Sequence, residues 1–333
     1  MLENTEALKV TREISRKEIV FGMARVTGSQ RVLFGGSDFQ VYDVDLAAEK
    51  SEPKSLGAHE SYVTGLAVAG KHLVSGGYDG KLIWWDLESG SKIRTVDAHS
   101  KWIRRVVATP DGSTIASVAD DMACRLWDAE TGSIRHELKG HQEITPHHYP
   151  SMLHSCAISP DGAHVATGDK LGHIVVWEIA SGKSVATMEA PVMYTWDPVQ
   201  RRHSIGGIRA LAFSPDGNSL AVGGIGKIGN IDHLEGLARL EVFDWKKGER
   251  TFELNVDGTK GIFERLLYFP DGGRLAGLGG ANDGFLMIFD LKGKAVAVNQ
   301  KAPAHLYDGS FGDSPDLLLA VGYHRVAAYE IKV

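Results

Sequence analysis

The sequence predicts an all-β fold assembled from seven similar units, and three observations support this prediction. The first is an aromatic residue followed by an acidic one at the end of a short apolar run: Trp85-Asp86, Trp127-Asp128, Phe243-Asp244 and Phe289-Asp290, with weaker copies at Tyr42-Asp43, Trp177-Glu178 and Tyr329-Glu330. The second is the spacing of these aromatics, which is 43 residues from Tyr42 to Trp85 and then 42, 50, 66, 46 and 40 residues to each next one. The third is a recurring Pro-Asp-Gly turn, at 110–112, 160–162, 215–217 and 270–272.

Each unit contains short runs of strand-forming residues. Residues 73–77 and 81–85 are rich in β-formers and are bounded by glycine and aspartate, as strands are. In Thr109-Pro110-Asp111-Gly112 and its copies, proline holds the second turn position and glycine the fourth, which suits a type I turn. A repeat of roughly 40–45 residues with four short strands is typical of a propeller blade. We therefore predict a seven-bladed β-propeller of four-stranded antiparallel blades, with 103–107 and 208–213 among the innermost strands.

The motifs occur together in one order, which is Ala58-His59, then Ser-Gly-Gly-Tyr-Asp-Gly at 75–80, then Trp85-Asp86. In this combination the chain resembles the WD-repeat family, most closely over residues 59–132. The resemblance implies that a terminal segment completes the last blade. Leu8, Val10 and Ile14 lie at alternate positions of one extended segment. We expect a closing strand at about 7–15, blades at about 16–333, and a single domain over 1–333.

Composition narrows the functional classes. The chain has 333 residues and a formal net charge of −6, which argues against a nucleic-acid binder because such proteins usually carry a basic stripe. No signal peptide or membrane span is readable near the N-terminus. Cys124 and Cys156 give neither a disulfide framework nor metal spacing, so a reducing cytoplasm is the expected location. No cofactor is predicted.

Two units contain the same histidine, serine, aspartate and tryptophan in the same order: His59, Ser75, Asp79 and Trp85, and then His99, Ser117, Asp121 and Trp127. A serine hydrolase would need an exposed nucleophile and an oxyanion hole, and no Gly-x-Ser-x-Gly elbow is present. In WD-repeat proteins these positions form a buried hydrogen-bond chain. We therefore predict a structural network and no enzyme activity. In the fourth unit Leu171 stands at the spacing where the aspartate is expected, so the network is predicted to be incomplete there.

Three insertions lengthen the repeat, at residues 142–152, 190–206 and 225–237. In antiparallel blades, the turns between first and second strands and between third and fourth strands open on one face. The remaining loops open on the other face, and all three insertions belong to it. Long loops on a rigid scaffold frequently carry function, although surface insertions are also thermodynamically cheap. We expect the three insertions to cluster over adjacent blades.

The insertions contain residue types that are enriched at binding hot spots. The predicted partner-binding residues are Tyr149, Tyr194, Trp196, Arg201 and Arg202 in the insertions, and Tyr62, Tyr78, Trp102, Arg104 and Asp120 in the second and third units. For Trp102, packing between blades is the alternative. His147, His148, His203 and His233 lie in or near the same loops, but no pair has the spacing of a defined metal site, so none is predicted.

The leading functional hypothesis is a non-catalytic scaffold that binds a protein or peptide on the face carrying the insertions. One alternative is a small-ligand or enzymatic site at the mouth of the central channel, where Arg104 or Arg209 could hold an anion. The other alternative is a structural subunit of a larger assembly. No nucleic acid or membrane partner is expected, and the sequence leaves the oligomeric state open.

Overall fold

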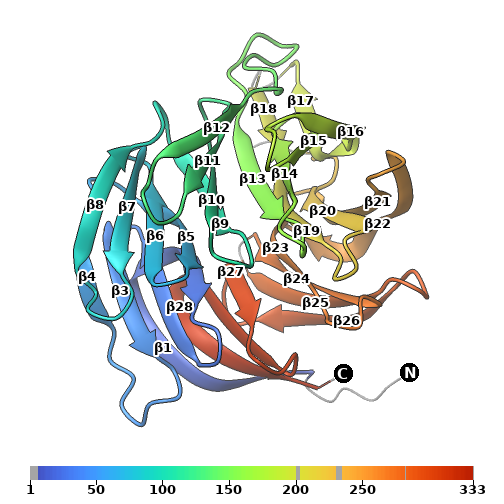
Figure 1. Ribbon diagram of the computed structural model, residues 1–333. Coiled ribbons are helices and arrows are strands. Elements are labelled where there is room, and N and C mark those ends of the chain that lie inside the picture. The colour runs from blue at the N-terminus through green and yellow to red at the C-terminus, as the bar shows by residue number, and fades with distance from the viewer. Residues whose placement is uncertain (1–6, 200–202, 230–234, 282, 333) are drawn as a thin grey trace.

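The computed structural model describes residues 7–199, 203–229, 235–281 and 283–332, and these residues form an all-β ring (Figure 1). Apart from one short 3-10 helix, η1 (Pro191–Met193), the described elements are strands. Consecutive strands pair antiparallel into radial blades, as predicted. The described residues contain no helix that is long and apolar enough to cross a membrane.

The first four blades follow one another along the chain. The first contains the later part of β1 (Leu8–Arg25) with β2 (Arg31–Gly36), β3 (Gln40–Asp45) and β4 (Lys54–Ala58). The second contains β5 (Val63–Ala69), β6 (His72–Gly77), β7 (Lys81–Asp86) and β8 (Lys92–Asp97). The third contains β9 (Ile103–Ala108), β10 (Thr114–Ala119), β11 (Cys124–Asp128) and β12 (Ile134–Leu138). The fourth contains β13 (Leu153–Ile158), β14 (His164–Asp169), β15 (His173–Glu178) and β16 (Ser184–Glu189).

The remaining strands complete the ring. A separate pair, β17 (Tyr194–Asp197) and β18 (His203–Gly206), precedes the fifth blade. The fifth blade contains β19 (Ile208–Phe213), β20 (Ser219–Ile225), β21 (Leu237–Asp244) and β22 (Glu249–Lys260). The sixth contains β23 (Ile262–Tyr268), β24 (Arg274–Gly280), β25 (Gly284–Asp290) and β26 (Ala295–Ala302). The last part of the chain forms β27 (Leu306–Phe311) and β28 (Leu317–Ile331).

Counted as hydrogen-bonded sheets, the described ring has six members of four or more strands, whereas the sequence predicted seven blades. The difference arises in the six-stranded sheet β27-β28-β1-β2-β3-β4. β28 folds back at His324, which has a φ of 61°, so that Ile331 N donates to Asp316 O at 2.7 Å. A straight strand would place these two residues roughly 50 Å apart. The two arms of β28, β27 and the start of β1 therefore make one set of four, and the rest of β1 with β2–β4 makes another.

The N-terminal closing strand is confirmed. The start of β1 pairs antiparallel with β28 from Leu8↔Ile331 to Ser15↔Arg325, and β1 runs beside β28 in Figure 1. Gln300 clamps the strand, since its amide donates to Leu8 O and its carbonyl accepts from Leu8 N, both at 2.9 Å. The side chain of Leu8 is buried. The pairing covers an edge that would otherwise expose unpaired backbone groups.

The predicted Pro-Asp-Gly turns also form. Gly112 N donates to Thr109 O at 2.8 Å, and Gly162, Gly217 and Gly272 make the same bond at 2.8–2.9 Å. Gly112 has a φ of 70°, in the left-handed region that glycine tolerates. In each turn the aspartate accepts a backbone N–H two residues later, as Asp111 does from Ser113 at 3.0 Å. The turns on this face of the ring, which we name the turn face, are therefore short, and their backbone groups form hydrogen bonds within each turn.

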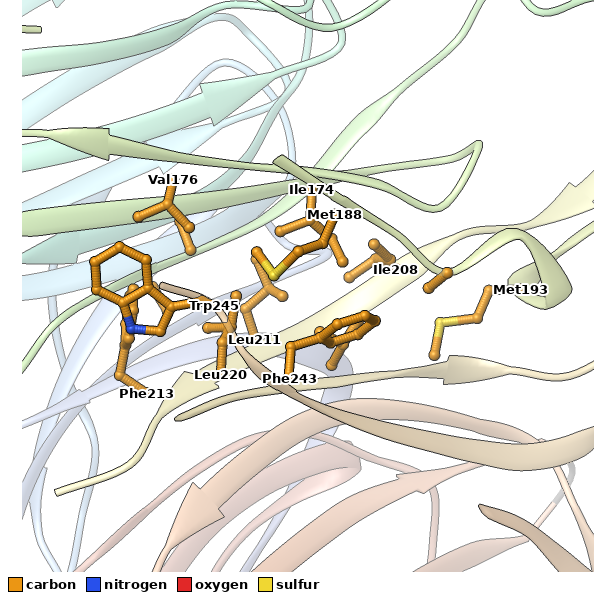
Figure 2. Packing of buried hydrophobic residues seen from close by; sticks show 14 residues of the cluster. Ile174, Val176, Met188, Met193, Ile208, Leu211, Phe213, Leu220, Phe243 and Trp245 are labelled. Carbon is orange, nitrogen blue, oxygen red and sulfur yellow. The ribbon is translucent and has the colours of Figure 1, made fainter. Parts of the chain in front are cut away.

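The core lies between neighbouring blades. Figure 2 shows one such layer between the fourth and fifth blades, where Val176 and Met188 face Leu211, Leu220 and Phe243. Met193, which follows directly from the start of the second insertion, is fully buried at one end of the same layer. The insertion is thereby anchored to the core at its root.

Candidate functional site

The predicted hydrogen-bond network is present in the second and third blades. Trp85 Nε1 donates to Ser75 Oγ at 2.8 Å, Ser75 Oγ contacts His59 Nε2 at 2.8 Å, and His59 Nδ1 contacts Asp79 at 3.0 Å. A carboxylate can only accept, so Nδ1 is the donor and Nε2 accepts from the serine hydroxyl. His99, Ser117, Asp121 and Trp127 repeat this arrangement at 2.8–3.0 Å.

The fourth blade has the complete network as well, which corrects the prediction that Leu171 leaves it incomplete. His141 Nδ1 contacts Asp169 at 2.9 Å, His141 Nε2 contacts Thr167 Oγ1 at 2.8 Å, and Trp177 Nε1 donates to Thr167 Oγ1 at 3.0 Å. Asp169 is two residues earlier in the repeat than Asp79 and aligns with Gly77. A Cβ at Gly77 would lie 3.1 Å from the Asp79 carboxylate. A carboxylate can therefore reach the histidine from either of these two backbone positions. A search at the fixed spacing of the second and third blades could not find the one in the fourth.

In the second- and third-blade networks, neither serine is available as a nucleophile. Ser75 and Ser117 are fully buried, and each hydroxyl is engaged by both a tryptophan and a histidine. A nucleophile must reach a substrate carbonyl, which these hydroxyls cannot do. Burial depresses the pKa of His99 even though the Asp121 carboxylate works against this effect. The histidine is therefore a neutral link in a structural chain.

The three insertions meet one another over the fourth and fifth blades, as expected. His147 from the first insertion stacks on Trp196 of the second at 4.2 Å and 9°, and its Nδ1 lies 2.9 Å from the Tyr194 hydroxyl. Ile228 N of the third insertion donates to Thr195 Oγ1 of the second at 3.0 Å. In Figure 1, β17 and β18 lie beside the loop that follows β12. The second insertion is a hairpin rather than an irregular loop, with Tyr194 paired to Gly206.

The predicted binding residues of the insertions differ in their environment. Tyr149 is 36% exposed and packs on Trp196 at 5.5 Å. Trp196 and Tyr194 are half-buried, because His147 covers one ring and contacts the other. Trp196 therefore holds the insertions together, and Tyr149 presents the more exposed ring. Arg201 and Arg202 lie outside the described residues.

A second aromatic group lies on the first three blades of the same face. We name Phe39, Tyr62, Tyr78 and Trp102 the aromatic band. Tyr78 stacks on Trp102 at 4.4 Å and 2°, and Tyr62 contacts Tyr78 and Phe39 at 5.6 Å each. Tyr62 is 39% and Trp102 49% exposed. Trp102 thus packs on Tyr78 of the neighbouring blade, as the alternative of packing between blades predicted, and still leaves about half of its surface open.

Arg104 and Asp120 connect the two groups. The Arg104 guanidinium donates to both Asp120 oxygens at 2.8 and 2.7 Å and to the Tyr78 hydroxyl at 2.6 Å. It also lies 5.3 Å from the Trp102 ring and 3.8 Å from the sulfur of Met152, beside the first insertion. Burial works to lower the pKa of Arg104, but the Asp120 hydrogen bond and the nearby charges of Asp120, Tyr78 and Glu264 together outweigh it and raise the pKa. Both side chains are therefore fixed in place before any partner binds.

The innermost strand of every blade has a β-bulge at the same point. In β9 the register with β10 shifts between Ile103 and Arg105, which leaves Arg104 unpaired, and the other six innermost strands shift likewise. Bulges re-aim side chains and are frequent beside functional sites. The seven bulged residues, which we name the mouth ring, are Phe21, Thr64, Arg104, His154, Arg209, Glu264 and Tyr307. All seven line a cavity of about 170 Å³ at the channel mouth, together with Tyr78 and Arg105.

Below the mouth ring, the channel contains a further charged group. Arg105 donates to Asp308 at 2.8 Å, and Arg265 lies 3.3 Å from the same carboxylate. The carboxylate of Asp308 thus lies in contact with two arginines. Burial and the charge of Arg105 together lower the pKa of Arg265 to about 10. Over the described residues, no group of three or more histidine, cysteine, aspartate and glutamate side chains could hold a metal ion.

The family described as WD domain, G-beta repeat matches residues 50–86, 90–128, 132–178 and 196–227. The chain belongs to the WD-repeat family. Three of the four matches cover most of the second, third and fourth blades, where the network is complete. The match at 196–227 covers part of the second insertion and the first two strands of the fifth blade.

Several known proteins are similar to parts of this WD-repeat chain. Nuclear distribution protein PAC1-2 of Uncinocarpus reesii is 28% identical over 182 residues, covering 48% of this chain and 35% of that protein. Eukaryotic translation initiation factor 3 subunit I of Nematostella vectensis is 29% identical over 184 residues, covering 54% and 51%. Apoptotic protease-activating factor 1 of Rattus norvegicus is 28% identical over 152 residues, covering 46% and 11%. The chain therefore spans about half or less of each of these relatives.

Sequence reasoning missed several residues of this face. Phe39 and Tyr307 lie in blades without the network, so no motif marked them. Lys170 was missed for a different reason, because the network aspartate of the fourth blade was expected two residues too late in the sequence, at position 171 instead of 169. Once Asp169 is aligned with Gly77, Lys170 falls at the position of Tyr78 and Asp120, which the sequence had selected.

Proposed function

We propose that this protein is a non-catalytic module that binds a protein or peptide partner on the face that carries its insertions, the insertion face. The observation that carries the proposal is the pairing of two aromatic groups on that face, joined through Arg104 and Met152. One group is the aromatic band, and the other contains Tyr149 and Trp196. Exposed aromatics beside an arginine are the residue types that dominate binding energy at interfaces.

The contrast with the turn face supports the proposal. There, aspartates satisfy the backbone of their own turns, and four similar turns recur. On the insertion face Trp102 stacks on Tyr78, and Tyr62 makes tilted contacts with Phe39 and Tyr78, yet both rings remain partly exposed. Stacking fixes these rings in one orientation, so less side-chain entropy is lost when a partner binds. A rigid, half-exposed aromatic surface is suited to a preformed interface.

The predicted absence of enzyme activity belongs to the same proposal. The histidine, serine and aspartate sets support it because they are buried and occupied by structural hydrogen bonds. The net charge of −6 favours a partner other than nucleic acid, and neither nucleic acid nor a membrane is part of the proposal. A cytoplasmic location fits the two buried free cysteines, Cys124 and Cys156.

Affinity purification with mass spectrometry identifies the partner, and variants of both groups then test the surface. Tyr62→Ala combined with Trp102→Ala, and separately Tyr149→Ala, should each weaken binding by about tenfold or more, since hot-spot truncations cost about 2 kcal/mol. Ile134→Ala is a matched control, because Ile134 is 50% exposed on the outer strand β12. Unchanged affinity in both surface variants, or equal loss in Ile134→Ala, would contradict the proposal.

A second candidate is a permanent subunit of a larger assembly. It is favoured by the similarity to a relative whose name describes it as a subunit of a translation initiation factor. A permanent subunit should co-purify with its neighbours at fixed stoichiometry and should not exchange with added free protein. A transient scaffold should exchange within the time of the experiment.

A further inference from the structure

The mouth ring contains two arginines at equivalent bulges, and only one of them has an ionic partner. Arg104 is held by both oxygens of Asp120 in its own blade. For Arg209, the nearest polar contact within the described residues is His154 Nδ1, at 3.4 Å from Nη1. The Nε of Arg209 is buried and has no hydrogen-bond partner. A buried cationic donor without a partner is costly, and a ligand is one way to satisfy it.

Lys170 adds a second cation beside it. Lys170 stands at the place in the fourth blade that Asp120 occupies in the third, so the carboxylate that serves Arg104 has no equivalent here. The lysine is only 5% exposed, and no hydrogen bond or ion pair of its ammonium group is found among the described residues. The backbone of Lys170 lies close to the chain that leads to Arg209, at Gly207, two residues before the arginine. A Cβ on Gly207 would lie 2.7 Å from Lys170 Cα and 3.2 Å from His154 Cδ2.

The charges around this point leave an excess of positive charge. Arg104 and Asp120 offset each other, and Glu264 is the one carboxylate of the mouth ring. Glu264 lies in the sixth blade, 3.6 Å from His305 Nε2. Burial and then the charge of Arg209 lower the pKa of Lys170. Burial also lowers the pKa of Arg209, although Glu264 works against this effect. These directions are opposite to that for Arg104, whose carboxylate partner is present.

His154 completes the pocket. Its Nδ1 faces Arg209 and acts as an acceptor, so its Nε2 carries the proton. That Nε2 is buried and has no partner. Burial, followed by the charges of Arg209, Arg104 and Lys170, lowers its pKa well below the usual value. The histidine is therefore a neutral donor whose N–H is unpaired.

We propose that Arg209, Lys170 and the Nε2–H of His154 form a binding site for an oxyanion at the channel mouth, in the form of a phosphate or a carboxylate group. Arginine and lysine are the usual protein donors to both groups. An anion here would supply the acceptor that Asp120 supplies to Arg104. Arg209 and His154 line the cavity at the channel mouth, and its other polar walls include Thr64, Glu264 and Tyr307 of the mouth ring together with Tyr78.

The experiment is a titration of selectively ¹⁵N-arginine-labelled protein with inorganic phosphate, observed through the arginine Nε–Hε signals. Acetate and chloride at equal ionic strength are the comparison arms. Phosphate or acetate should shift the Arg209 Nε–Hε signal saturably, whereas chloride should not. A stronger response to phosphate assigns the site to phosphorylated ligands, and an equal response to acetate assigns it to acidic groups in general. No saturable shift with either oxyanion overturns the proposal.

A comparison of the apparent Kd for phosphate between variants provides a second measurement, which does not depend on assigning NMR signals. Arg209→Gln and Lys170→Gln should each raise the apparent Kd for phosphate by about tenfold, because each removes a charge-assisted hydrogen bond. Both variants should melt no lower than the parent in phosphate-free buffer, since neither side chain has an ion pair to lose among the described residues. Lys292→Gln, on the turn face, is the matched control and should keep the parent Kd. Equal Kd values across all four proteins overturn the proposal. Partner binding is measured separately, so a negative result here leaves the proposed function standing.

Discussion

Blades two to four and blades five and six fill the same interior position with opposite chemistry. In the former, a hydroxyl at Ser75, Ser117 or Thr167 joins a tryptophan to a histidine. In the sixth blade Gly277 stands there, and the Phe263 ring lies 2.5 Å from where a Cβ would be. Phe263 in turn packs edge-on against Phe285 and Phe289 at 5.2 and 5.8 Å. Both arrangements fill the space between strands, so packing alone does not explain why one is polar.

The polar network and the aromatic cluster differ in whether they make hydrogen bonds to the adjoining loops. The network aspartates also accept backbone N–H groups of the adjoining loops, as Asp79 does from Glu60 at 2.9 Å and Lys81 at 3.0 Å. These loops contain Tyr62, Tyr78 and Trp102. Asp169 likewise holds the turn after Lys170 through Leu171 N at 2.8 Å. The polar blades therefore fix the loops of the insertion face, whereas the aromatic cluster of the sixth blade contains no such link.

The largest expected effect comes from the side of the ring that lacks the network. Deleting residues 1–15 removes the closing strand and exposes an edge of β28. The lost burial of Leu8 and Ile14 and the lost ladder bonds sum to on the order of 5 kcal/mol, which approaches the whole stability of many domains. We expect aggregation or loss of cooperative melting. In the full-length chain, Leu8→Ser should lower the melting temperature and Val10→Ser, at a 37% exposed position, should not. Equal melts for the two variants would contradict the closure.

The corrected fourth-blade network gives the next effect in size. Asp169→Ala removes the acceptor of His141 and of two backbone N–H groups, from Leu171 and His173. Leaving buried donors unpaired should lower the free energy of unfolding by about 1–3 kcal/mol, as should Asp79→Ala in the second blade. Leu171→Ala is the matched control and should cost clearly less. Urea denaturation measures all three, and a loss for Asp169→Ala no larger than that for Leu171→Ala would contradict a role of Asp169 in the network.

Acid should weaken the polar blades selectively. Burial works to raise the pKa of Asp79, but the hydrogen bond and charge of His59 and two backbone N–H groups together outweigh it and lower the pKa. His99 and Arg125 together lower the pKa of Asp121 further, against the same effect of burial. A carboxyl group whose pKa is lower in the folded than in the unfolded state stabilises the fold at pH values above its unfolded pKa of about 4. This stabilisation is lost as the pH falls from about 4 toward the folded-state pKa. Stability measured by urea should therefore fall below about pH 4 in the parent. Asp121→Asn should be less stable at pH 7 but show a shallower fall. Parallel pH curves would show that Asp121 does not contribute.

The smallest effect on stability is expected at the surface. Tyr62→Ala and Trp102→Ala remove exposed rings, so each should change the free energy of unfolding by less than about 1 kcal/mol. Thermal melts run beside the binding assays check this separation. A large loss of stability would mean that the aromatic band is part of the core, and the binding losses would then need another explanation.

The repeat pattern predicted most of the fold because its signals are local. A proline, an aspartate and a glycine specify their own turn, and alternation specifies a strand. Asp169 was missed because the carboxylate that contacts the network histidine can come from either of two backbone positions. The spacing in the second and third blades indicates only one of them. The hairpin at 194–206 was missed because its strands have only four residues each. Of the mouth ring, the sequence indicated only Arg104 and Arg209 as residues near the channel mouth, since the seven members share a bulge and no residue type.

The account rests on the claim that the polar blades hold a preformed binding surface on the insertion face. Backbone hydrogen exchange of the protein, free and with its purified partner, tests this claim most directly. We predict slowed exchange on binding in residues 59–64, 76–80, 99–104, 144–152 and 191–197, with the turn face unchanged. Slowed exchange confined to the Pro-Asp-Gly turns at 109–112, 159–162 and 214–217 would contradict it.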